Sequence, residues 1–108
     1  MSYSIEYNHI MYQIETTEGF DAWINGLKDR LTRIRLRRRL DKAKRGLLGD
    51  VATVGEGVSE MREFFGPGWR MYYLQQGDVL IVMLGGGDKS TQQVDIVAAI
   101  ELASLFKE

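Results

Sequence analysis

Residues 59–75 read SEMREFFGPGWRMYYLQ, two strand-like runs on either side of Gly66-Pro67-Gly68. Glycine and proline in this arrangement are typical of a turn, so the runs at 59–65 and 69–75 predict a β-hairpin. With a three-residue loop, residue 65 lies opposite 69, 64 opposite 70 and 62 opposite 72. Because cross-strand partners point to the same side, one face is expected to carry Arg62, Phe64, Arg70 and Tyr72, with Glu60 nearby.

The rest of the chain predicts further strands and helices around this hairpin. Strands are expected at 10–15, 51–54 and 79–84, and helices at 18–28, from Asp29 to Gly46, and at 91–106. The first two helices are joined so briefly that they are expected to form an αα-hairpin. The run at 79–84 is apolar throughout, which is typical of a central strand covered on both faces. Together these elements predict an α+β domain, with helices on one side of a mainly antiparallel sheet.

Length and composition limit the chemistry of the chain. Its 108 residues fit one domain, 1–108, in which residues 1–9 are expected to be less ordered. There is no cysteine, and His9 is the one histidine, so thiolate chemistry is excluded and a multi-histidine metal site is not expected. No apolar run is long enough to span a membrane, and the first residues do not resemble a signal peptide. A cytoplasmic protein without a membrane partner is therefore expected.

The basic residues are concentrated in one segment. Residues 28–45 hold ten of the fourteen lysines and arginines and two acids, a net charge of +8, whereas the rest of the chain sums to −9. Such a segment favours a polyanion such as RNA, or an acidic protein segment. The alternative is a solvated helix face with no ligand. The candidate RNA-binding residues are Arg33, Arg35, Arg37, Arg38, Arg39 and Lys42.

Residues 85–91, GGGDKST, invite comparison with a phosphate-binding loop. The ATPase pattern G-x-x-x-x-G-K-[ST] does not fit, because Asp88 separates the last glycine from Lys89. We expect a glycine-rich loop before the last helix, which Ser90 or Thr91 caps. It is either a plain turn or an anion site at the helix N-terminus.

Paired arginines on a rigid sheet suit one reaction in particular. RNA carries its own nucleophile, the 2′-hydroxyl, so aligning it with the phosphorus and neutralising the transition state is enough for cleavage. A guanidinium group binds two phosphate oxygens at once, and Glu60 among cations is a candidate acceptor for the hydroxyl proton. The structural alternative is that Glu60 or Glu63 neutralises the arginines in an ion pair.

Four segments together resemble a known family. They are TRIRLRRRL at 32–40, GVSEMR at 57–62, GPGWRMYY at 66–73 and GGGDKSTQ at 85–92. The chain resembles phage-derived addiction-module killer proteins, a HigB-like branch of the RelE/ParE toxin superfamily, over about residues 15–106. The resemblance implies an N-terminal helical hairpin packed on a mainly antiparallel twisted sheet, followed by a C-terminal helix.

The resemblance also implies a function. The chain would be the toxin of a type II toxin–antitoxin module, an mRNA endoribonuclease that acts on the ribosome without metal or cofactor and leaves a cyclic phosphate. Its partners would be the ribosome, mRNA and a cognate helix-turn-helix antitoxin. It would contact operator DNA only as part of the complex with that antitoxin. ParE-like inhibition of DNA gyrase is an alternative, as is a decayed toxin that only binds its antitoxin.

By motif position, the resemblance implies catalytic roles for three cations. Arg70 would bind the scissile phosphate, Arg62 would neutralise the transition state, and Lys89 would clamp substrate or assist as an acid. Relatives carry lysines near the position of Glu60 and a tyrosine or histidine in the tail, and this chain has neither. Glu60 and Tyr72 are therefore the candidate proton-transfer groups. The nuclease interpretation expects the two guanidinium groups to converge on the sheet, and it fails if both are locked in internal ion pairs or point to opposite surfaces.

Overall fold

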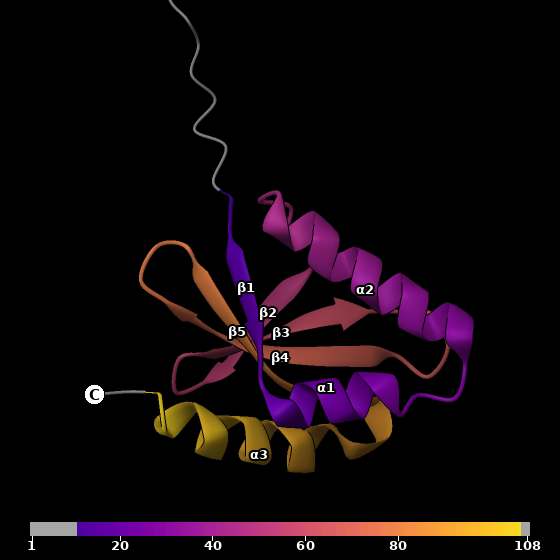
Figure 1. The fold of residues 1–108 in the computed structure, drawn as a ribbon. Helices are drawn as coiled ribbons and strands as arrows, with labels where there is room; N and C mark the ends of the chain where they lie inside the picture. Colours follow the sequence, from indigo (N-terminus) through magenta and orange to yellow (C-terminus); the bar gives the residue numbers. More distant parts are fainter. Residues whose placement is uncertain (1–10, 107–108) are drawn as a thin grey trace, which may run out of the picture.

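The computed structural model of the protein describes residues 11–106, which form an α+β fold (Figure 1). In chain order the elements are β1 (Gln13–Thr16), α1 (Glu18–Asn25), α2 (Arg30–Lys44), β2 (Val51–Gly55), β3 (Val58–Glu63), β4 (Trp69–Gln76), β5 (Leu80–Asp88), the 3-10 turn η1 (Lys89–Thr91) and α3 (Gln92–Ser104). The predicted α+β class and element order are confirmed. The expectations for residues 1–9 and for His9 lie outside the described residues.

Within residues 11–106 the strands form one mixed sheet in the order β1-β5-β4-β3-β2. β1 runs parallel to β5, and the other neighbouring strands are antiparallel. No helix in this part of the chain is long and apolar enough to cross a membrane.

The central hairpin forms with a longer turn than the sequence predicts. Glu63 pairs with Trp69, Arg62 with Arg70 and Glu60 with Tyr72, so residues 64–68 form the connection instead of 66–68. The predicted register is therefore wrong by two residues. A slip of two positions leaves every side chain on its predicted face, because side chains alternate with a period of two.

The helices cover both faces of the sheet, so the prediction that they share one side is wrong. One apolar core joins α1 and α2 to the sheet and includes Phe20, Ile24, Leu36, Met71 and Ile81. A second core joins α3 to the other face and includes Val58, Tyr72, Val82, Ala99 and Ala103. Figure 1 shows α2 above the strands and α3 below them. The physical reason is that β4 and β5 are apolar on both faces, and each face needs its own cover.

The two N-terminal helices pack on the same face of the sheet but diverge from residues 26–29 (Figure 1), so the predicted αα-hairpin does not form as a packed antiparallel pair. Asp29 is the N-cap residue of α2, as predicted, and Gly46 follows its last turn with φ at 89°. A positive φ favours glycine, which explains why this helix ends here.

The glycine-rich segment 85–88 is the end of β5, not the loop that the sequence predicts. Gly86 pairs with Met71 and Gly87 with Arg70 in the sheet. A side chain at Gly86 would overlap the Trp23 ring of α1, and one at Gly87 would overlap the Asp95 carboxylate of α3. The glycines therefore allow α1 and α3 to approach the strand closely. Glycine within a strand often marks such a close approach.

We expect Gly86→Ala and Gly87→Ala each to lower the free energy of unfolding by about 1–3 kcal/mol, because the added methyl group meets packed atoms. Gly85→Ala is the matched control, since a Cβ at Gly85 meets nothing within 4 Å. It should be neutral or stabilise by up to about 1 kcal/mol. Urea unfolding of the three variants checks this. Equal losses at all three positions would contradict the close-approach explanation.

Candidate functional site

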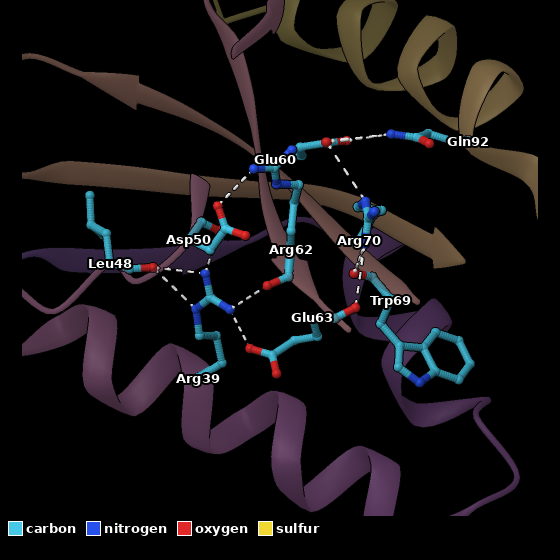
Figure 2. Close-up of polar contacts among 9 residues, drawn as sticks. All are labelled: Arg39, Leu48, Asp50, Glu60, Arg62, Glu63, Trp69, Arg70 and Gln92. Atoms are coloured by element: carbon cyan, nitrogen blue, oxygen red, sulfur yellow. Dashed lines mark hydrogen bonds and ion pairs between the residues drawn. The ribbon is translucent and has the colours of Figure 1, made fainter. Parts of the chain in front are cut away.

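A buried polar cluster lies between β3, β4 and the start of α3 (Figure 2). Glu60 and Arg70 are each 4% exposed, and Arg70 Nε lies 3.7 Å from Glu60 Oε2. Gln92 Nε2 donates to Glu60 Oε1 at 3.0 Å. Arg70 Nη1 donates to the backbone oxygens of Trp69 at 3.0 Å and Glu63 at 3.4 Å. Arg70 is thus held inside the protein with its charge opposed by Glu60.

Arg62 lies directly across from Arg70 in the hairpin but is nearer to solvent. Its Nη2 donates to Asp50 Oδ1 at 2.8 Å, and the two side chains are 35% and 40% exposed. The hydrogen bond and charge of Asp50 raise the pKa of Arg62. An ion pair this exposed is worth at most about 1 kcal/mol, so a phosphate can compete for the guanidinium group.

Of the two outcomes that would exclude the nuclease interpretation, placement on opposite surfaces does not occur, and a buried internal ion pair holds Arg70 but not Arg62. Arg62 and Arg70 do converge, since they are direct cross-strand partners on the same face. They are not free of carboxylates, because Glu60 faces Arg70 and Asp50 binds Arg62. The structural alternative of an internal ion pair with Glu60 therefore holds for Arg70. Glu63 binds Arg39 instead.

Tyr72, a candidate proton-transfer group, is fully buried beside this cluster. It is the cross-strand partner of Glu60, and its hydroxyl has no hydrogen-bond partner among the described residues. Burial, followed by the charges of Glu60 and Asp95, raises the pKa of the Tyr72 hydroxyl. In this conformation neither Tyr72 nor Glu60 is open to a ligand.

Arg39 is an internal anchor rather than part of the expected RNA-binding surface. Its guanidinium group donates to the backbone oxygens of Leu48, Asp50 and Arg62, at 2.7–3.1 Å, and binds the Glu63 carboxylate (Figure 2). Only 8% of the residue is exposed. The helical pattern alone could not reveal this, because Arg39 lies in a run of three arginines whose other members face solvent.

The other basic residues of α2 are more open. Arg35, Arg37, Arg38 and Lys42 are exposed, and Arg33 is half-buried. Arg33 donates to the backbone oxygen of Leu27, and Arg37 donates to Asn25, so these two also brace the connection to α1. A shallow groove on this face is lined by Arg35, Arg38, Arg39, Lys42 and Glu63. The predicted electropositive helix face is therefore present without Arg39.

Lys89 is exposed at the β5–α3 junction, next to the β3–β4 turn. Its backbone N–H donates to Gly68 O at 2.9 Å. A side chain built at Gly68 would meet Lys89 Cδ at 3.4 Å and Arg70 Nη1 at 3.8 Å. Lys89 and Arg70 therefore meet at this turn, although they are nineteen positions apart in the sequence.

The expected anion site at 85–91 is occupied by the protein's own acid. Asp88 Oδ1 accepts from Ser90 N at 2.8 Å and from the Ser90 hydroxyl, which lowers the pKa of Asp88. Thr91, the residue before α3, donates its hydroxyl to Asp95 at 2.6 Å. The plain-turn alternative is wrong for residues 85–88, which are strand, and the Ser90 N–H at the start of η1 is capped by Asp88 instead of an external anion. No group of three acids, histidines or cysteines suited to a metal ion occurs in residues 11–106.

The sequence places the chain in a family with a bacterial relative. It is 41% identical, over 91 residues, to a Haemophilus influenzae protein described as an uncharacterized protein. The aligned part is 84% of this chain and 92% of the relative. The chain belongs to that protein's family. No protein-family model matches the sequence.

Three site residues were missed by the sequence reasoning. Asp50 and Gln92, which contact Arg62 and Glu60, lie outside the hairpin and reach it only through the fold. Phe65 lies under the guanidinium group of Arg35, with its ring centroid 3.7 Å from Arg35 Cζ. The two consecutive phenylalanines before Gly66 were the sequence feature from which this last contact could have been predicted.

Proposed function

We propose that the chain is the toxin of a type II toxin–antitoxin module, a HigB-like member of the RelE/ParE superfamily that cleaves mRNA on the ribosome. The observation that carries the proposal is the set of cations around the β3–β4 turn, with Arg62 and Arg70 on the face of the sheet that α3 covers and Arg35 on the α2 face. Arg35 comes from α2, Arg62 from β3, Arg70 from β4 and Lys89 from η1. Of these cations, Arg62, with its exposed ion pair, and the exposed Lys89 are the ones that a phosphate backbone can reach.

The proposed reaction uses the 2′-hydroxyl of RNA as the nucleophile. Its oxygen attacks the adjacent phosphorus, the bond to the 5′-oxygen breaks, and a cyclic phosphate and a 5′-hydroxyl form. Arg62 neutralises charge on the phosphate oxygens after it exchanges Asp50 for substrate, and Lys89 protonates the departing oxygen. Arg70 acts as a positioning residue held by Glu60. Glu60 accepts the hydroxyl proton once Gln92, at the start of α3, moves away. Tyr72 cannot be that base, because its raised pKa keeps the hydroxyl protonated.

The exposed basic face of α2 is proposed to lie against ribosomal RNA. Arg35, Arg38 and Lys42 supply sequence-independent contacts to phosphates, which weaken as salt is raised. A helix-turn-helix antitoxin is the proposed protein partner. A reading frame for such a protein beside that of this chain is the expected gene arrangement.

The burial of Arg70 favours a second candidate, ParE-like inhibition of DNA gyrase. Arg70 is 4% exposed and faces Glu60, as a purely structural arginine would. Inhibition of gyrase by binding needs no phosphate-binding pair on this sheet.

Mapping mRNA 5′ ends after induction of the protein tests the two candidates. Wild type should give cuts that depend on translation, and Arg62→Ala should reduce the cutting rate about 100-fold or more. Lys44→Ala removes an exposed cation from the end of α2 and should cut normally. Growth arrest with intact mRNA would refute the nuclease proposal. DNA cleavage complexes in a gyrase supercoiling assay would establish the second candidate.

A further inference from the structure

Phe64 lies at the start of the β3–β4 turn with most of its ring in solvent. Its exposed fraction is 70%, which is large for a phenylalanine. Two guanidinium groups lie near the ring: Arg70 Cζ is 5.6 Å and Arg62 Cζ 5.9 Å from its centroid. An exposed aromatic ring beside two cations is a feature that neither the proposed chemistry nor the core uses.

The neighbouring Phe65 shows what a structural aromatic residue looks like at this turn. Phe65 is half-buried, packs against the core of α1, α2 and the sheet, and carries Arg35 on its ring. Phe64 belongs to neither apolar core. The ring of Phe64 is therefore not explained by packing.

We propose that Phe64 is a stacking platform for an unpaired base of single-stranded RNA, with Arg62 and Lys89 binding the flanking phosphates. The ring is 70% exposed, so a flat base can reach it from solvent, and stacking tolerates any base because each has a π-face. Arg62 has a weak, exposed ion pair that a phosphate can replace, and Lys89 lies exposed beside Gly68 in the same turn. The proposal rests on the proposed function only in taking RNA as the ligand.

The Phe64 platform gives this surface a preference for single-stranded over double-stranded RNA, which the basic helix α2 does not provide. Phosphate contacts from α2 attract both single-stranded and double-stranded RNA, since both present a phosphate backbone. A base can stack on Phe64 only when it is not already stacked and paired in a duplex. The platform thus directs single-stranded RNA to the β3–β4 turn, where Arg62 lies near the Phe64 ring and Lys89 lies beside Gly68.

Fluorescence anisotropy with 2′-O-methyl oligonucleotides tests the platform apart from cleavage, because this RNA lacks the nucleophile. Phe64→Leu should weaken binding of a short single strand about 5- to 100-fold, whereas Phe64→Trp should bind as tightly as wild type or tighter. Leu31→Ala, which trims a 68% exposed apolar residue on α2, is the control and should change nothing. Binding of a hairpin duplex should be the same for all four proteins. An abasic single strand should abolish the difference between wild type and Phe64→Leu.

Two results would overturn the platform. One is unchanged single-strand affinity in Phe64→Leu, and the other is an equal loss for duplex and single strand, which would indicate a change in folding or charge. If unchanged affinity accompanies translation-dependent mRNA cleavage, the platform is wrong and the nuclease proposal stands. If the base-dependent loss appears without any mRNA cleavage, the platform stands and the nuclease proposal fails.

Discussion

Replacing Arg39 with alanine should lower the free energy of unfolding by about 3–5 kcal/mol. The substitution removes the group that ties α2 to the β2–β3 side of the sheet. It removes the Arg39 hydrogen bonds to the backbone oxygens of Leu48 and Arg62 and one of the two to Asp50 O, which keeps the Arg62 N–H at 2.9 Å. It also leaves Glu63 without its cation. Unsatisfied polar groups in a buried site lose their hydrogen bonds without regaining water. Urea unfolding followed by circular dichroism measures the loss.

Arg38→Ala is the matched control, because Arg38 precedes Arg39 on the same helix and is exposed. Its effect should stay within about 0.5 kcal/mol. Arg39→Lys should destabilise nearly as much as Arg39→Ala, since one ammonium group cannot reach acceptors arranged for a planar fork. A loss below about 1 kcal/mol for Arg39→Ala would show that the anchor is not maintained in solution, and Arg39 would return to the set of RNA-binding candidates.

Glu60→Gln should lower the free energy of unfolding by about 3 kcal/mol, although the side chain keeps its shape. The change leaves Arg70 as a buried cation with no carboxylate facing it, and Arg70 Nε already has no hydrogen-bond partner among residues 11–106. The penalty arises from the uncompensated charge rather than from lost packing. Thermal and urea unfolding of the variant check the value.

Asp50→Asn provides the comparison, because it breaks the other arginine–carboxylate pair of the site. The pair of Arg62 and Asp50 is open to solvent, so its loss should cost less than about 1 kcal/mol. If Glu60→Gln were as mild as Asp50→Asn, Arg70 would have to be hydrated in solution. Arg70 would then be available to bind a phosphate directly, as the family resemblance implies.

The hairpin shows why some of the candidate site is predictable. The predicted face does carry Arg62, Arg70, Glu60 and Tyr72. This holds even though the turn, residues 64–68, is two residues longer than predicted. Side-chain alternation is a local property of extended backbone, so it survives an even error in register. The turn length was not predictable, because Phe64 and Phe65 read equally well as strand residues.

The segment 85–88 shows the opposite case. Three glycines and an aspartate have low strand propensity, so a loop was the reasonable prediction. The strand continues because Trp23 and Asp95, from helices on opposite faces, pack where side chains would otherwise lie. Propensity describes an isolated segment, and packing partners from distant residues override it.

By itself, the sequence determined the α+β class, the order of the elements, the basic character of α2 and the face that the hairpin arginines share. These follow from composition and from the local periods of helix and strand. Only the tertiary structure decided that α3 covers the opposite side of the sheet, that Arg39 and Arg70 are buried, and that Arg62 and Lys89 remain accessible. Burial depends on which distant segment packs over a residue, and no local pattern contains that information.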